Sequence, residues 1–365
     1  MPLDPFFEER LRVHRRYLFD QALGSVRKRL TALWPFGRAP VPAPRPASGP
    51  ASAPTSAGAK TKKPKRALTP REKHRRAALA WDRAELQNVG TPGPDIRTTE
   101  HTVEVAGRPP VRVRIYHPPG GDEKPTPAVL AFFGGAFRIG GIDYPTTDAA
   151  FRRRAVDAEV AVVAVDYALA PEHRYPTQVE QGYAALRWLF EHATDLGIDR
   201  DRIGLLGTSA GAGLAAAVTL MNRDGAGLPL RLQVLEVPVV DLTGGSLDLR
   251  ATRALRIPRF LVLRELRSVA RTYLPGRRSA RDAYASPLRA ASHAGLPPAV
   301  ILTAEFDPLR GDGDAYAAAL RRAGVDASAV RYLGVTHDTP IFTRVLPAAR
   351  RWHDDVVAAL RRLHV

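Results

Sequence analysis

The chain has 365 residues, of which 45% are hydrophobic, so it is long enough for one large α/β domain with appended segments. It contains no cysteine, which excludes disulfides, thiolate metal sites and a cysteine nucleophile. It has no apolar run of about 18 residues and no secretory signal pattern, so we expect no transmembrane helix and a cytoplasmic location, with membrane association left open.

The net charge of +17 belongs mainly to the N-terminal extension. Residues 1–76 hold 18 Lys and Arg against 5 Asp and Glu, whereas residues 77–365 hold 36 against 32. No nucleic-acid-binding motif accompanies the basic extension. We therefore expect no nucleic-acid partner.

Residues 1–36 have the pattern of a basic amphipathic helix, because Phe7, Leu11 and Leu18 recur at four- and seven-residue spacing among arginines. Such a segment can make a peripheral contact with an anionic membrane surface. It can equally dock on its own domain, or on a second copy of the chain in a homodimer. Residues 37–66 are rich in Pro, Ala, Ser and Gly, which is typical of a linker.

Residues 67–365 have the pattern of a folded α/β domain. Two alternating segments, 98–105 and 111–116, predict an antiparallel pair of strands around Gly107. Short apolar runs predict further strands at 128–133, 160–165, 203–206, 232–240, 299–304 and 327–333. Helical patterns occur at 71–88, 147–158, 178–193, 210–222, 311–323 and 342–363. Strands that alternate with helices predict a mostly parallel, twisted sheet with helices on both faces.

One long segment, 242–290, follows a predicted strand but has only helix and loop patterns. An insertion between two strands lies near the carboxyl ends of a parallel sheet, where active sites form. We expect a helical cap built from about residues 67–95 and 242–285.

The sequence Gly207-Thr208-Ser209-Ala210-Gly211 fits the G-x-S-x-G pattern. A short apolar run, 202–206, precedes it and a run of small apolar residues, 212–221, follows it. A serine on a sharp strand-to-helix turn is a nucleophile elbow. The motif alone is a weak signal, but this strand-and-helix context makes Ser209 a candidate nucleophile.

A serine nucleophile needs a base, and the base needs an acid that orients it. In α/β-hydrolases these groups follow in the order Ser, Asp or Glu, His, each after a strand. Asp307 follows the predicted strand 299–304, and His337 follows the run 329–333. The main rival acid is Asp241, which also ends a predicted strand; we prefer Asp307.

Attack by a serine hydroxyl on a carbonyl group also requires donors that hold the oxyanion that forms. The sequence Phe133-Gly134-Gly135-Ala136-Phe137 follows a predicted strand, and its glycines allow backbone N–H groups to face a shared cavity. An ordinary Gly-Gly turn is the alternative. The N–H of Ala210, directly after the nucleophile, is a further candidate donor.

Over about residues 70–365 the chain resembles the hormone-sensitive-lipase-like family of α/β-hydrolases, the microbial esterases marked by an H-G-G-G motif. Five blocks match in order: 133–137, 166–173, 207–212, 307–310 and His337. The resemblance implies a triad of Ser209, Asp307 and His337. It also implies oxyanion donors at Gly135, Ala136 and Ala210, and short- to medium-chain acyl esters as substrates.

Four positions depart from the family pattern. Phe133 replaces the motif histidine, Ala136 the third glycine, Ala168 an arginine, and Asp338 the usual glycine after the catalytic histidine. Together they suggest a divergent member with an altered substrate or lowered activity, because the family histidine helps to hold the oxyanion loop.

The resulting hypothesis is a serine carboxylester hydrolase with a small-molecule ester substrate and no metal or organic cofactor. Three alternatives remain open at this point. One is a non-catalytic binding protein on the same fold, and another is an amidase or deacetylase of a small metabolite. The third is a membrane-surface or nucleic-acid adaptor built on the basic extension.

Overall fold

The computed structural model describes residues 1–13, 68–121 and 124–365. The chain divides into one compact unit of Met1–Asp4 with His74–Val365 and a second unit of Pro5–Lys73. Residues 5–13 are helical, whereas the rest of the predicted helix over 1–36 and the linker 37–66 lie outside the described residues. Among the described helices, none is both long and apolar enough to cross a bilayer.

The larger unit is built on an eight-stranded sheet with the order β1-β2-β4-β3-β5-β6-β7-β8. Strands β1 and β2 pair antiparallel, β2 and β4 also pair antiparallel, and every other neighbouring pair is parallel. The strands are β1 (Thr98–Val103), β2 (Val111–Tyr116), β3 (Thr126–Phe132), β4 (Ala161–Asp166), β5 (Ile198–Thr208), β6 (Leu230–Glu236), β7 (Ala299–Ala304) and β8 (Ala327–Tyr332). The predicted mostly parallel sheet and its antiparallel edge pair are confirmed.

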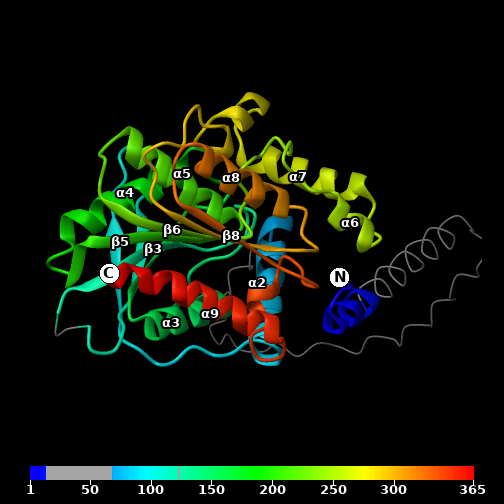
Figure 1. Ribbon diagram of the computed structural model, residues 1–365, viewed down its shortest axis with the longest axis horizontal. Helices are drawn as coiled ribbons and strands as arrows, with labels where there is room; N and C mark the ends of the chain where they lie inside the picture. The colour runs from blue at the N-terminus through cyan, green and yellow to red at the C-terminus, as the bar shows by residue number, and fades with distance from the viewer. Residues whose placement is uncertain (14–67, 122–123) are drawn as a thin grey trace, which may run out of the picture. The chain divides into compact units, whose positions relative to one another are not determined.

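Helices cover both faces of this sheet. Figure 1 shows α3 and α9 on one face, with α4, α5 and α8 on the other. The helices are α2 (Pro70–Asn88), α3 (Pro145–Ala158), α4 (Thr177–His192), α5 (Ala210–Asp224), α6 (Arg250–Ala254), α7 (Arg259–Tyr273), α8 (Arg310–Arg322) and α9 (Pro347–Arg361). Almost every residue of α5 is buried, which is why its sequence is small and apolar on all sides.

One predicted strand boundary is wrong. The apolar run 232–240 predicts a strand to its end, but β6 stops at Glu236. The next residue, Val237, has φ of 40°, and Pro238 has no N–H to donate to a neighbouring strand. The chain turns here toward α5, where the N–H of Val239 donates to the carbonyl oxygen of Ser209 at 3.2 Å.

The segment between β6 and β7 contains α6, α7 and two short 3-10 helices, Arg277–Arg281 and Pro287–Arg289, with no strand among its described residues. Its longest helix, α7, packs on the loop after β3. The rings of Phe137 and Tyr273 stack with their centroids 3.8 Å apart. This segment therefore supports the loop that the sequence marks as the oxyanion loop.

Helix α5 crosses the end of β3 at very short range. A Cβ atom on Gly211 would lie 2.2 Å from the carbonyl oxygen of Phe132 and 2.3 Å from that of Phe133. A Cβ atom on Gly207 would lie 2.3 Å from the carbonyl oxygen of Gly211. These backbone contacts leave room only for hydrogen at both positions.

We expect Gly211→Ala to lower the free energy of unfolding by about 1–3 kcal/mol, because the added methyl group forces backbone apart in a packed core. Gly276→Ala is the matched control, since beyond its chain neighbours no atom of the described residues lies within 4 Å of a Cβ there, and it should change stability by less than about 0.5 kcal/mol. Urea unfolding of both variants measures the difference. Equal midpoints for the two variants would contradict the close approach.

Candidate active site

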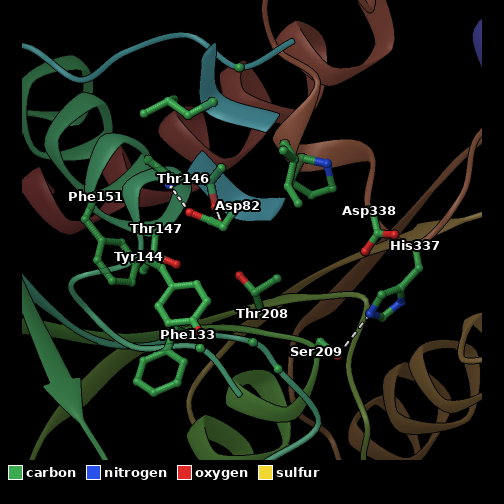
Figure 2. Close-up of a pocket in the computed structure, with 18 of the residues that line it drawn as sticks. Asp82, Phe133, Tyr144, Thr146, Thr147, Phe151, Thr208, Ser209, His337 and Asp338 are labelled. Carbon is green, nitrogen blue, oxygen red and sulfur yellow. Dashed lines mark hydrogen bonds between the residues drawn. The ribbon is translucent and has the colours of Figure 1, made fainter. Parts of the chain in front are cut away.

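The structure brings together the three residues that the sequence suggests for catalysis. Nε2 of His337 lies 3.0 Å from Oγ of Ser209, and its Nδ1 lies 2.7 Å from Oδ2 of Asp307. Figure 2 shows Ser209 and His337 facing each other, with Asp338 beside the imidazole. The serine lies between β5 and α5, the aspartate follows β7 and the histidine follows β8, so all three come from the carboxyl edge of the sheet.

Ser209 adopts a strained backbone conformation, with φ of 57° and ψ of −116°. Its N–H donates to the carbonyl oxygen of Glu236 at 2.8 Å, and its own carbonyl oxygen accepts from Ala212 and Gly213. A non-glycine residue keeps such a conformation only when its surroundings over-determine it. This backbone conformation directs the Ser209 hydroxyl out of the sheet and toward the pocket.

Of the two candidate acids, Asp307 is the one in contact with His337. Its Oδ1 accepts the N–H of Leu309 at 2.9 Å, so both carboxylate oxygens have a partner while the side chain is almost fully buried. Asp241 instead forms an ion pair with Arg289 at 2.8 Å and accepts from Thr243. The geometry therefore favours Asp307 as the group that orients the imidazole.

The loops that carry the acid and the base are tied to each other. The N–H of Phe306 donates to the carbonyl oxygen of Val335 at 2.9 Å, and the N–H of Gly334 donates to Oε2 of Glu305 at 2.7 Å. The N-terminal ammonium of Met1 also contacts the Glu305 carboxylate at 2.9 Å. These contacts limit how far His337 can move relative to Asp307.

The electrostatic environment of His337 favours its charged form. Burial alone would lower the pKa of its imidazole, but the Asp307 carboxylate, with a smaller contribution from Asp338, reverses this and raises the pKa to about 9. Asp338 stands where the resembling family has glycine, so part of this effect belongs to the present chain.

Two of the candidate oxyanion donors, Gly135 and Ala136, line the same cavity as Ser209, and the third, Ala210, is the next residue in the chain. A Cβ atom on Gly134 would lie 3.4 Å from Cβ of Ser209, so this backbone touches the serine. Gly135 and Ala136 follow with φ of 133° and 53°. Within the described part of the chain, the N–H groups of Gly135, Ala136 and Ala210 have no hydrogen-bond acceptor. Such free donors beside a nucleophile can stabilise a developing oxyanion.

Phe133, which stands in place of the motif histidine, is held by a neighbouring aromatic ring. Its ring stacks on that of Tyr167 with centroids 4.1 Å apart and an interplanar angle of 8°. The Tyr167 hydroxyl donates to the carbonyl oxygen of Phe133 at 2.8 Å. The start of the oxyanion loop is thus held by packing and by one buried hydrogen bond, a device that the sequence does not reveal.

Sequence reasoning also missed a buried polar cluster beneath the nucleophile. The carboxylate of Glu236, which is fully buried, accepts from Oγ1 of Thr208 at 2.8 Å, from Nε1 of Trp352 at 2.8 Å and from Arg154 at 2.9 Å. The available signal was a glutamate inside the apolar run 232–240, because a charge is rarely buried without a specific partner.

A cavity of about 370 Å³ opens on Ser209 and His337. The side chains of Asp82, Tyr144 and Thr146, labelled in Figure 2, line it between α2 and α3. Most of its wall is apolar and comes from Trp81, Leu86, Phe133, Ile139, Phe151 and Ile341. The described residues contain no group of three or more potential metal ligands.

Comparison with known proteins agrees with this fold and site. The family model described as an alpha/beta hydrolase fold matches residues 129–341. Carboxylesterase NlhH of Mycobacterium tuberculosis is 37% identical over 292 residues, covering 77% of this chain and 88% of that protein. Esterase LipI of the same organism is 38% identical over 272 residues, covering 73% and 82%. The crystal structure of the thermostable carboxylesterase EstE1 superimposes with a TM-score of 0.73 at 36% identity, over 81% and 98% of the two chains.

The fold and its neighbours thus define an α/β-hydrolase. The chain belongs to the hormone-sensitive-lipase-like family of carboxylesterases within that fold, and it is a carboxylester hydrolase.

The raised pKa of His337 predicts that the low-pH limb of the activity profile lies at a higher pH than for an ordinary histidine. The imidazole must be neutral to accept a proton, so activity should be lost as pH falls through its folded pKa, above the ordinary 6.5. We expect Asp338→Asn to move this limb of kcat/KM to lower pH, because it removes one of the charges that favour the imidazolium. Asp326→Asn, an exposed acid outside the site, is the control. An unmoved limb in Asp338→Asn would show that Asp338 does not influence the base.

Proposed function

We propose that Ser209, His337 and Asp307 form the catalytic triad and that the enzyme cleaves short- to medium-chain acyl esters through an acyl-enzyme. The continuous chain of hydrogen bonds from Asp307 through His337 to Ser209 carries this proposal. The resemblance to carboxylesterases supports it.

In the first half-reaction, Nε2 of His337 takes the proton of the Ser209 hydroxyl while Oγ attacks the ester carbonyl carbon. The negative charge that develops on the carbonyl oxygen is stabilised by the N–H groups of Gly135, Ala136 and Ala210. The tetrahedral intermediate collapses when His337 gives its proton to the leaving alcohol. Asp307 remains ionised and stabilises the imidazolium.

In the second half-reaction, a water molecule replaces the alcohol. His337 takes a proton from this water as it attacks the acyl carbon, and the proton then returns to Oγ of Ser209. The carboxylic acid leaves and the free enzyme is restored. No step requires a metal or organic cofactor.

The size of the cavity supports a small or medium acyl group. At about 370 Å³, it falls at the lower end of the range for small-molecule sites, roughly 300–1,000 Å³. Its mostly apolar wall suits a hydrocarbon chain rather than a charged group.

A series of p-nitrophenyl esters from acetate to palmitate tests this function. We expect kcat/KM to peak at short or medium length and to fall for the longest chains. Ser209→Ala and His337→Ala should each lower kcat by about 10⁴–10⁶-fold, because the triad acts as a unit. Asp307→Asn should cost about 10⁴-fold, whereas Asp241→Asn should retain most activity.

Three outcomes would contradict the proposal. If Asp241→Asn is inactive and Asp307→Asn is active, the assigned acid is wrong. Faster cleavage of the matching p-nitroanilides would favour an amidase. No turnover of any ester by the wild-type protein would favour a non-catalytic binding role.

We also propose a cytoplasmic location with a peripheral membrane contact through residues 1–36. The absence of cysteine and the basic, amphipathic pattern of this segment support the proposal. Replacement of Arg15, Arg16, Arg27, Lys28 and Arg29 by glutamine should weaken flotation with anionic vesicles. Unchanged flotation, with a shift from dimer to monomer in sedimentation, would instead favour docking on a second copy of the chain.

A further inference from the structure

The nearly balanced charge of the catalytic domain hides a strong local imbalance. Residues 249–281, here called the arginine-rich segment, contain ten arginines, no lysine and a single acid, Glu265. The rest of residues 77–365 holds 26 Lys and Arg against 31 Asp and Glu. The basic charge of the domain is therefore concentrated in the segment that contains α6 and α7.

All ten of these arginines are exposed. Among the described residues, Arg250 is the only one of the ten with an ion pair, to Asp248 at 2.8 Å. Glu265 does not neutralise any of them, because it pairs with Arg138 outside the segment. The other nine guanidinium groups are exposed and have no acidic partner in the part of the chain that the structure describes, which favours an anionic ligand from outside the chain.

The same surface carries exposed apolar side chains. Phe260, in the first turn of α7, is 66% exposed, and Leu261 beside it is 38% exposed. One stripe along the helix contains Phe260, Arg264, Arg267 and Arg271, because these positions are separated by four, three and four residues. The opposite side of α7 buries Val269 and Tyr273. A stripe that joins an exposed aromatic ring to a row of cations matches a lipid interface.

Helix α7 is firmly attached to the catalytic domain. Beyond the stack of Tyr273 on Phe137, Arg138 donates to Oγ of Ser268 at 3.3 Å and pairs with Glu265. The N–H of Tyr175 donates to the carbonyl oxygen of Tyr273 at 2.9 Å. Whatever binds the exposed stripe of α7 is therefore held close to the loop after β3, which lines the active-site cavity.

We propose that the arginine-rich segment is a docking surface for an anionic lipid membrane. Phe260 and Leu261 insert among the acyl chains, and the arginines contact lipid phosphates. Docking concentrates the enzyme where apolar esters dissolve. A nucleic acid would also attract the arginines, but it offers no apolar phase for Phe260 and Leu261, so the exposed pair favours lipid.

Flotation of the full chain with phosphatidylglycerol–phosphatidylcholine vesicles tests the proposal, with pure phosphatidylcholine vesicles in parallel. The triple variant R264Q/R267Q/R271Q should bind about a hundredfold more weakly, since each basic residue near an anionic surface contributes about 1 kcal/mol. The matched control R187Q/R322Q/R351Q removes the same charge from exposed positions elsewhere and should bind like the wild type. Phe260→Ser should weaken binding alone, because it removes the inserted ring.

Catalysis supplies an independent readout. The α7 variants and the arginine control should hydrolyse soluble p-nitrophenyl acetate at the wild-type rate, whereas only the α7 variants should lose rate on an ester dissolved in anionic vesicles. Ser209→Ala should still float, so failure of the triad assignment is distinguishable from failure of docking.

Several results would overturn the proposal. Equal flotation of the wild type and the α7 variants would assign any membrane contact to residues outside α7. Equal binding to neutral vesicles would remove the role of the arginines. Tight binding of a short DNA duplex that depends on the three arginines but not on Phe260, without vesicle binding, would identify the surface as a nucleic-acid site.

Discussion

The geometry of the active site depends on one buried carboxylate, that of Glu236. It joins the end of β6 to Thr208 on β5, to Arg154 on α3 and to Trp352 on α9, while its backbone carbonyl receives the N–H of Ser209. A charge in such a place is tolerated only when it is paired and its oxygens are satisfied. Removing any one partner would leave a charge or dipole uncompensated, so the sheet, two helices and the nucleophile turn are held in one arrangement.

The nucleophile and its base are held in different ways. Ser209 is held by buried polar contacts and by the close approach of β3 and α5, which Gly207 and Gly211 allow. This packing keeps the serine backbone in its strained conformation. His337 lies on a loop and is about one third exposed. Its position depends on Asp307 and on the ties between the loops after β7 and β8. The base is therefore the member of the triad with the greater freedom to adjust as substrate binds.

The parts of this site that follow chain order were predictable, and the parts that rest on distant pairing were not. Ser209, Asp307 and His337 each follow a short apolar run, and parallel strands bring their carboxyl ends to one edge. In the Glu236 cluster, Arg154 lies 82 positions and Trp352 lies 116 positions from the glutamate along the chain, and no motif links them. The stack of Phe133 on Tyr167 was equally unpredictable. The sequence shows that Phe133 replaces the motif histidine, but it does not show which ring packs on Phe133. The early end of β6 followed from a local turn at Val237 that apolar periodicity does not record.

The two kinds of charge in this domain serve different ends. At the nucleophile, charged groups are buried and paired, so they act over short distances in a medium of low polarity and salt screens them little. On α7 the arginines are exposed and lack acidic partners among the described residues, so the reach of their charges is limited to about one Debye length, roughly 8 Å at physiological ionic strength. Exposed charges of this kind add little to folding stability, since surface ion pairs themselves contribute only about 0–1 kcal/mol. Selection for stability alone therefore gives no reason to gather ten arginines in 33 residues, whereas attraction to an external anionic surface does.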